Sequence, residues 1–347
     1  MEYRFLGDTG LRVSAVSYGF MDVYEQSILD TMLPIVHKLG VNFFDCAEIY
    51  GWPSHSPGHV ETLFGNALKK LDVDREDLVI STKMIKGGDT PNKVGLSYKH
   101  VVKGLETSLK RLQLDYVDVV FAHRDDAFTS MEEICRGFNT LIEDGKAYYW
   151  ATSEWSADRI TEAFAVCDRL GLIRPIADQP EYSMLWREKM EKEYVSLFAN
   201  HRYGTTVWSP LCGGILTGKY NEEIPGDSRL GEQGFFAQFY TKYMGTAHID
   251  ETRKKLRQIA DISKEIGCSM GQLALAWTLK NKDVSTAIVG AKKPSHIEEN
   301  VKAVEFINSI TPEIEERIEK ILNNRPDPGV DFRTWAPLKP RRAVSTL

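Results

Sequence analysis

The sequence predicts an α/β fold in which parallel strands close into a barrel. Eight short apolar runs alternate with helix-like segments along the 347 residues, and no change in composition divides the chain. Repeated βα units imply a parallel sheet. Eight of them in a chain of this length favour a closed (β/α)8 TIM barrel, in which chemistry takes place at the carboxyl ends of the strands.

The first segment indicates a β-hairpin ahead of the barrel. Tyr3–Leu6 and Leu11–Ser14 flank Gly7-Asp8-Thr9-Gly10, a link rich in turn-forming residues. The strand-like runs that follow are short, apolar and bounded by turn signals. The predicted barrel strands are Ala15–Tyr18, Val41–Phe44, Leu78–Thr82, Tyr116–Ala122, Ala147–Ala151, Ile176–Gln179, Thr205–Trp208 and Thr286–Val289.

The helices are predicted from apolar periodicity and from their end signals. In the first, Leu29, Met32, Leu33 and Val36 share one face. Ser97 and Ser156 stand where N-caps are expected. The predicted helices are Ile28–Leu39, Val60–Leu71, 98–112, Met131–Glu143, 157–170, Glu188–Asn200, Glu251–Ile266, Met270–Lys280 and Ser295–Val304, with Thr311–Leu322 as an extra C-terminal helix.

A doubly wound sheet is the alternative fold. A dinucleotide-binding protein of that type carries a GxGxxG turn after its first strand, and Gly19-Phe20-Met21 does not fit that pattern. We therefore expect one barrel domain over residues 1–325, interrupted by an irregular stretch over 211–248. Residues 326–347 are expected to form a tail rich in proline and arginine.

Composition excludes several classes of function. A net charge of −6 gives no sign of a nucleic-acid surface, and no apolar run approaches the roughly 20 residues of a membrane span. Five scattered cysteines without a CxxC pair argue against a disulfide framework, and we expect no metal site. The first residues lack the features of a signal peptide, so we expect a cytoplasmic protein.

Four polar residues stand where an active site would place them. Asp45, Lys83 and His123 close three consecutive predicted strands, and Tyr50 lies in the loop after the first. Any one of them alone would more often be an ordinary surface ion pair or a half-buried side chain. Together they suggest that the Tyr50 phenol acts as a proton donor, because a neighbouring ammonium such as that of Lys83 favours the phenolate and lowers the pKa of the phenol.

His123 and the later strand ends extend the candidate site. A neutral imidazole at a strand end can donate to a carbonyl oxygen, although a buried histidine satisfied by backbone is the simpler interpretation. Ser153 and Gln179 together offer the donor and the acceptor that a carboxamide needs. Trp208 could stack on a flat ring or belong to the core. After the last strand, Gly290 and Lys292 open a helix, where an anion could bind or where the turn is simply solvated.

These residues resemble those of the aldo-keto reductases. The spread Asp45, Tyr50, Lys83 and His123 is similar to the tetrad of that family. Further stretches resemble the branch that contains the voltage-gated potassium channel β subunits and their microbial relatives. These stretches are Leu109–Val120, Tyr149–Ser156, Gln179–Tyr182, Trp208–Leu211 and Gly218–Tyr220.

The resemblance covers about residues 1–325 and implies a barrel closed below by the hairpin, with NADPH bound across the strand ends. It implies Tyr50 as general acid, Lys83 lowering its pKa, Asp45 orienting Lys83, and His123 polarising the substrate carbonyl. Ser153 and Gln179 would hold the nicotinamide carboxamide, and Trp208 would stack on the ring. The implied pyrophosphate and adenosine contacts are Ser209, Leu211, Gly213, Lys219, Arg229, Gly290, Lys292, His296, Glu299 and Asn300.

The sequence departs from the family pattern at two places. Animal channel β subunits have Asn where this chain has His123, which therefore resembles the catalytically competent members. Glu154 replaces the Asn of the Ser-Asn pair common in the wider family, so we do not expect Glu154 to bind the cofactor.

We therefore expect NADPH-dependent reduction of aldehydes and ketones. Trp52, Met84 and the aromatic stretch 235–240 are candidate walls of the substrate pocket, and that stretch could equally pack on the barrel or at a subunit contact. The alternatives are an NADP(H)-binding regulatory subunit with slow turnover, similar to a potassium channel β subunit, and a barrel enzyme that forms a Schiff base on Lys83. The resemblance also implies either a homo-oligomer such as a tetramer or a channel partner.

Overall fold

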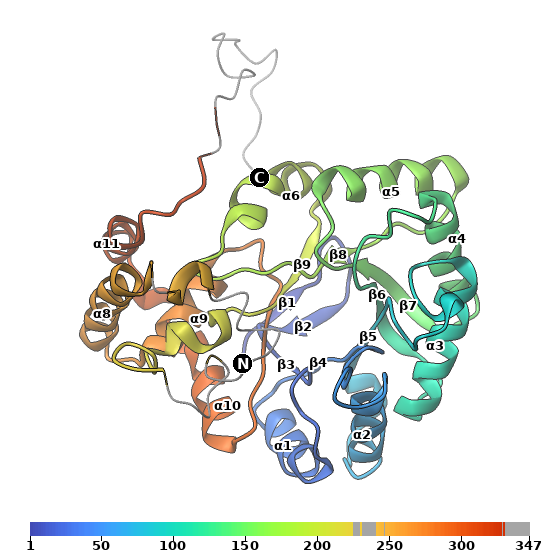
Figure 1. Cartoon of the computed structure of the whole chain (residues 1–347), viewed down its shortest axis with the longest axis horizontal. Coiled ribbons are helices and arrows are strands. Elements are labelled where there is room, and N and C mark those ends of the chain that lie inside the picture. The colour runs from blue at the N-terminus through green and yellow to red at the C-terminus, as the bar shows by residue number, and fades with distance from the viewer. Residues whose placement is uncertain (225–229, 231–240, 246, 328, 330–347) are drawn as a thin grey trace.

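The computed structural model describes residues 1–224, 230, 241–245, 247–327 and 329, and it contains a closed barrel of parallel strands (Figure 1). The strands follow the order β10-β3-β4-β5-β6-β7-β8-β9 around the barrel. This arrangement confirms the predicted (β/α)8 TIM barrel. The strands are β3 (Val16–Gly19), β4 (Phe43–Asp45), β5 (Val79–Met84), β6 (Val117–Ala122), β7 (Ala147–Thr152), β8 (Ala177–Asp178), β9 (Gly204–Val207) and β10 (Thr286–Val289).

The predicted hairpin is present and closes the amino end of the barrel. β1 (Tyr3–Phe5) and β2 (Arg12–Ser14) pair antiparallel. The turn of the hairpin touches the start of β9, since a Cβ added at Gly204 would lie 2.6 Å from the backbone nitrogen of Gly7. Leu6 is fully buried in a cluster with inward-facing residues of the barrel such as Phe43. The hairpin therefore excludes water from this end, and the opposite end carries the polar side chains.

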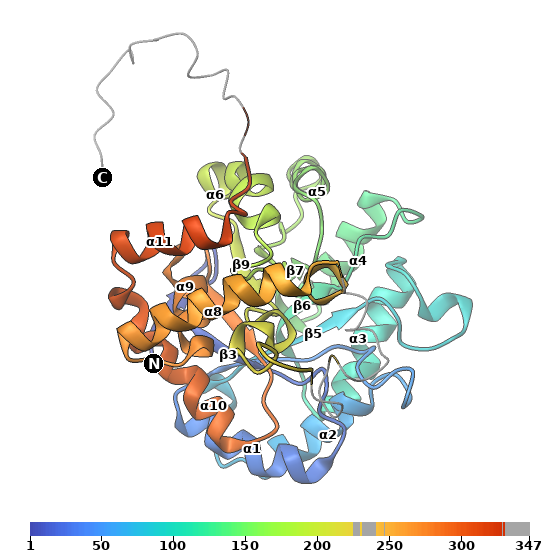
Figure 2. The same ribbon diagram turned by 60° about the vertical axis from the view of Figure 1, so that its left-hand side comes forward.

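Helices surround the barrel, and the last ones lie outside the regular alternation (Figure 2). α8 and α11 pack together, and Arg317 of α11 pairs with Glu265 of α8 at 2.8 Å. The helices are α1 (Gln26–Lys38), α2 (His59–Leu68), α3 (Tyr98–Leu112), α4 (Met131–Glu143), α5 (Ala157–Leu170), α6 (Val195–His201), α8 (Ile249–Ile266), α9 (Met270–Lys280), α10 (Pro294–Val301) and α11 (Pro312–Leu322).

Two predicted helices differ from those observed. The segment predicted as Glu188–Asn200 forms a wide π-helical turn over Lys189–Glu193 before α6. The side chains of Lys189 and Tyr194 both donate to the carbonyl of Trp155, which holds this turn against the end of β7. The helix predicted as Ser295–Val304 changes after Val301 into a 3-10 helix, Lys302–Ser309. Apolar periodicity does not distinguish these tighter and wider turns from an α-helix.

The described residues contain no helix long and apolar enough to cross a membrane. The division at residue 325 stays a prediction, because almost all of 326–347 lies outside the described residues.

Candidate active site

The barrel brings the predicted strand-end residues to one face. Asp45 is the last residue of β4, and Lys83 is the last but one of β5. His123, Ser153, Gln179, Trp208 and Gly290 are each the first residue after a strand, following β6, β7, β8, β9 and β10. Because parallel strands present their carboxyl ends to the same side, residues up to 245 positions apart in the sequence share this face.

Lys83 is the centre of the buried polar cluster. Its ammonium lies 2.5 Å from Asp45 Oδ2, 3.0 Å from the hydroxyl oxygen of Tyr50 and 2.9 Å from the carbonyl oxygen of Cys46. The Lys83 side chain is fully buried. An ammonium has three N–H donors, so all three are satisfied and the nitrogen is fixed beside the phenol.

Asp45 is held by three donors from two strands, Lys83 and Ser81 of β5 and Gln179 after β8. Besides the Lys83 contact, its Oδ1 accepts from Ser81 Oγ at 2.8 Å and from Gln179 Nε2 at 3.1 Å. Gln179 is 134 positions away in the sequence, so only barrel closure makes this contact. Asp45 therefore fixes Lys83 and also links the tetrad to the residue expected at the carboxamide.

The pKa directions in this cluster differ from the expectation for Tyr50. Desolvation, followed by the charge of Asp45, raises the pKa of Tyr50 well above its usual value of 10.0. Desolvation also lowers the pKa of Lys83, although the Asp45 carboxylate opposes this. The net direction for Tyr50 is therefore opposite to the predicted lowering of its pKa, because burial and the charge of Asp45 outweigh the nearby positive charge of Arg124. The phenol is held in its protonated form, which a proton donor requires.

His123 faces Tyr50 with an unused nitrogen. The two ring centroids are 6.0 Å apart, with the rings near perpendicular at 77°. Desolvation, together with the charges of Lys83 and Arg124, lowers the pKa of His123 well below 6.5, so the imidazole is neutral. Within the described part of the chain, its buried Nδ1 has no hydrogen-bond partner. Buried polar atoms without partners are rare, so this atom indicates a place for a ligand group.

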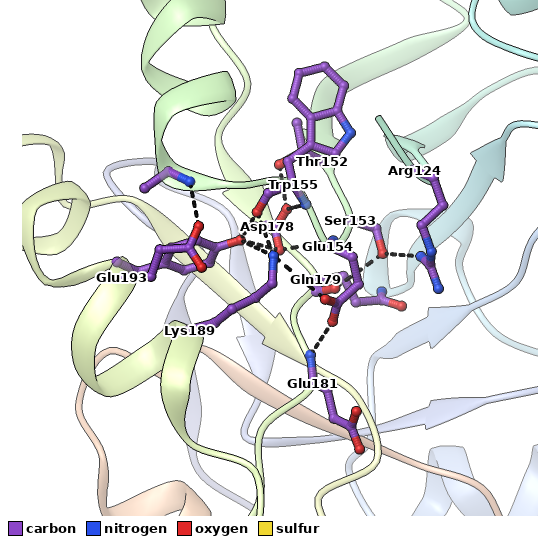
Figure 3. Close-up of polar contacts among 12 residues, drawn as sticks. Arg124, Thr152, Ser153, Glu154, Trp155, Asp178, Gln179, Glu181, Lys189 and Glu193 are labelled. Atoms are coloured by element: carbon purple, nitrogen blue, oxygen red, sulfur yellow. Dashed lines mark hydrogen bonds and ion pairs between the residues drawn. The ribbon is translucent and has the colours of Figure 1, made fainter. Parts of the chain in front are cut away.

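The residues expected at the carboxamide lie side by side (Figure 3). Ser153 Oγ donates to the backbone oxygen of Gln179 at 3.1 Å and accepts from Arg124 Nη1 at 3.1 Å. Both Ser153 and Gln179 are buried. Their side chains thus stand at neighbouring strand ends, next to the tetrad through the Gln179–Asp45 contact.

Glu154 has a structural role that the sequence did not reveal. One of its oxygens accepts from Trp208 Nε1 at 2.8 Å and from the backbone nitrogen of Glu181 at 2.5 Å, the latter drawn in Figure 3. The Lys189 ammonium lies 3.6 Å from the other oxygen. Glu154 therefore holds the indole of Trp208 through its N–H group. The sequence offered one signal for this role, the position of Glu154 directly after Ser153.

The segment after Trp208 forms a tight glycine-dependent turn. Gly213 and Gly214 have φ values of 61° and 97°, inside the 3-10 segment Cys212–Thr217. Such values favour glycine, because a Cβ is strained there. Ser209 Oγ accepts from the backbone nitrogen of Gly213 at 3.2 Å and stabilises the turn. Leu211 is half-buried and Lys219 exposed, so this turn presents backbone and one ammonium to the same face.

The residues after β10 form the far end of the predicted cofactor site. Gly290, Lys292 and His296 are exposed, whereas Asn300 is buried. The carboxylate of Glu299 accepts from Ser269 Oγ at 2.5 Å and so joins α10 to the start of α9. Arg229 lies outside the described residues, and so does the stretch 235–240.

The two predicted substrate residues lie in different surroundings. Trp52 is 45% exposed, and the Lys86 ammonium lies 4.0 Å from its ring centroid, at the mouth of the site. Met84 is fully buried and faces α3, where a Cβ added at Gly104 would lie 3.1 Å from its sulfur. Met84 follows the inward-facing Lys83 on β5, so the alternation of the strand turns it away from the barrel axis. The Met84 side chain therefore packs against α3 and not toward Tyr50, in contrast to the prediction that it lines the substrate pocket.

The donor set fits a nicotinamide dinucleotide. Ser153 and Gln179 could hold its carboxamide, Trp208 could offer an apolar face, and the glycine turn and Lys292 could offer backbone donors and positive charge. The His123 ring, whose Nδ1 has no partner among the described residues, lies 6.0 Å from the Tyr50 ring, and a substrate oxygen could be held near the two. Among the described residues, no group of three or more His, Cys, Asp or Glu side chains could hold a metal ion.

The barrel and the polar residues at its strand ends indicate one enzyme family, and comparison of the sequence with known families agrees. The sequence model of the Aldo/keto reductase family matches residues 17–323. The chain therefore belongs to the aldo/keto reductase family.

The relatives narrow the resemblance to one branch. A Schizosaccharomyces pombe protein, whose name marks it provisionally as a voltage-gated potassium channel subunit beta, is 49% identical over 334 residues, covering 93% of this chain and 94% of its own length. Two proteins named "Probable voltage-gated potassium channel subunit beta" are 44% identical in Oryza sativa and 43% identical in Arabidopsis thaliana. Each covers 96% of this chain and 100% of its own length. The predicted similarity to this branch is confirmed.

Proposed function

We propose that this protein catalyses the NADPH-dependent reduction of aldehydes and ketones to alcohols, with Tyr50 as the general acid. The observation that carries the proposal is the contact of Lys83 with both Asp45 and Tyr50, at 2.5 Å and 3.0 Å, beside the unpartnered Nδ1 of His123. A protonated phenol next to a fixed ammonium is a donor whose conjugate base is stabilised as it forms.

Each residue has one task in the proposed reaction. Bound NADPH would supply a hydride to the carbonyl carbon, because the hydride chemistry belongs to the cofactor. His123 holds the carbonyl oxygen, and the electron pair of the C=O bond moves onto that oxygen as the hydride arrives. Tyr50 then gives its proton to the oxygen, and the Lys83 ammonium stabilises the phenolate that remains. Ser153 and Gln179 would orient the carboxamide, and the indole fixed by Glu154 would keep the ring in place.

The experiment is a turnover assay with a Tyr50→Phe control. Loss of NADPH absorbance is followed with a panel of aromatic and short-chain aldehydes. We expect turnover by the wild type and a fall in kcat of about 100- to 10,000-fold in Tyr50→Phe, because the acid is removed while the ring is kept. Equal turnover by both proteins would show that Tyr50 is not the acid.

A second function is favoured by the names of the relatives. Because those proteins are named as channel β subunits, we also consider an NADP(H)-binding regulatory subunit with slow turnover and a channel or homo-oligomeric partner. Tight NADPH binding without turnover on every aldehyde would favour it. A Schiff base on Lys83 has no such support, since all three of its donors are engaged and the nitrogen is buried. A cytoplasmic location remains part of the proposal.

A further inference from the structure

Arg124 is a charged group of the site that the proposed reaction does not use. It follows His123 at the end of β6, and its side chain points toward Ser153 (Figure 3). Nη1 donates to the carbonyl oxygen of His123 at 2.5 Å and to Ser153 Oγ at 3.1 Å. The guanidinium thus lies between the residue expected to hold the substrate oxygen and a residue expected at the carboxamide.

Arg124 has no carboxylate partner among the described residues. Three other half-buried arginines of this protein are paired with carboxylates. Arg75 lies 2.7 Å from Asp118, Arg111 lies 3.1 Å from Glu61, and Arg159 lies 2.9 Å from Asp125. Half-buried Arg253 likewise contacts a carbonyl oxygen, that of Tyr220, at 3.1 Å. A partly buried charge is costly unless it is paired, so an anion beside Arg124 would be stabilised.

The acidic residues nearest in sequence are committed elsewhere. Asp125 makes two contacts with Arg159, at 2.9 Å and 3.0 Å. Asp126 accepts from the backbone nitrogens of Leu96 and Phe128 and from the Thr129 hydroxyl. Within the tetrad, Asp45 already neutralises Lys83. None of these three carboxylates is therefore a partner of Arg124.

Two of the guanidinium nitrogens, Nε and Nη2, carry N–H groups that make no contact with described residues and are not enclosed by protein. A planar pair of donors matches a carboxylate in a bidentate manner. The family resemblance places the cofactor pyrophosphate at the turn after β9, away from Arg124, so an anion bound by Arg124 would belong to the substrate.

We propose that Arg124 selects carbonyl substrates that carry a carboxylate, by pairing its free N–H groups with that carboxylate while His123 and Tyr50 hold the carbonyl. This inference rests on the proposed reductase function and names its substrate class.

The test compares charged and neutral substrates of the same shape. The 3- and 4-isomers of carboxybenzaldehyde differ in the distance between aldehyde and carboxylate. Each acid is assayed beside its methyl ester. The readout is the ratio of kcat/KM for the acid to kcat/KM for its ester. Effects on folding or on cofactor binding act on both substrates and cancel in this ratio.

Three variants make the test specific. Arg124→Met removes the charge at similar size, Arg124→Lys keeps it, and Arg202→Met removes one charge from an exposed arginine near Asp8 of the hairpin, at the opposite end of the barrel. We expect the wild type to prefer the acid of at least one isomer. In Arg124→Met that ratio falls by about 10- to 100-fold, the value of a charged hydrogen bond, whereas Arg124→Lys loses less. Arg202→Met retains the wild-type ratio.

The outcomes separate this inference from the proposed function. Two results would overturn the substrate role of Arg124 and leave the reductase intact. One is an acid-to-ester ratio of kcat/KM that Arg124→Met does not change. The other is an equal loss of kcat/KM for acid and ester, together with weaker NADPH binding. Absence of turnover on every aldehyde would instead defeat the reductase. In that case calorimetric titration of benzoate into the NADP⁺-loaded protein decides the anion site: binding lost in Arg124→Met supports it, and equal binding contradicts it.

Discussion

The buried pair of Lys83 and Asp45 makes a sharp prediction about stability. In Lys83→Met the ammonium disappears, and the Asp45 carboxylate keeps only the Ser81 and Gln179 donors, at 2.8 Å and 3.1 Å. Both members of the pair are nearly inaccessible, at 0% and 3% side-chain exposure, so water cannot replace the lost partner. Leaving one charge of a buried pair without its partner costs about 3–5 kcal/mol of the free energy of unfolding.

The double variant Lys83→Met/Asp45→Asn separates charge from packing. It contains no unpaired buried charge, so we expect it to recover at least half of the lost stability while remaining inactive. Urea unfolding followed by circular dichroism gives the free energies for wild type, single and double variants. A loss below about 1 kcal/mol in Lys83→Met, the range of exposed pairs, would refute the view that this pair is buried and strongly coupled. A double variant no more stable than the single would show that packing, and not charge, dominates.

Two further variants test groups that contact the site only indirectly. Glu154→Leu removes the acceptor of Trp208 Nε1, so we expect the Kd for NADPH, measured by fluorescence titration, to rise about tenfold, whereas Glu154→Gln, which keeps an acceptor oxygen, changes it less. Equal effects of both substitutions would contradict the positioning role of Glu154. Burial, followed by the charge of Glu154, raises the pKa of Glu181 from 4.5 to about 8. The folded state therefore holds this proton more tightly than the unfolded chain, and the stability from Glu181 is fully present below pH 4.5 and lost as the pH rises through 8. Relative to Glu181→Gln, the wild type should lose unfolding free energy between pH 5 and pH 8, and a difference that does not change with pH would disprove the assignment.

Much of the fold followed from local patterns. Strands and helices could be placed because apolar runs and 3.6-residue periodicity depend on short stretches of chain. Barrel closure followed from counting eight units. The π-helical turn at Lys189–Glu193 and the late 3-10 helix were not predicted, because apolar periodicity does not separate such turns from an α-helix, and the π-helical turn is also held by contacts of Lys189 and Tyr194 with the distant carbonyl of Trp155.

The positions of the candidate site residues could also be predicted from the sequence, whereas the groups that surround them could not. A polar residue that closes an apolar run must emerge at a strand end, and parallel strands bring such ends together, so Asp45, Lys83 and His123 were found from sequence. The orientation of Met84 could have been derived from the alternation of β5 with Lys83. Arg124 and Glu154 stood beside predicted residues, but their importance depends on which partners they meet.

The sequence by itself determined the barrel, the face that carries the polar residues and the family. Only the tertiary structure decided the contact of Gln179 with Asp45, the burial that raises the pKa of Tyr50, and the absence of a carboxylate partner for Arg124 among the described residues. Secondary structure depends on neighbours within a few residues, whereas desolvation and charge pairing depend on every group that closure brings within a few ångströms. Those quantities have no local signature, so the chemistry of this site is set by long-range packing.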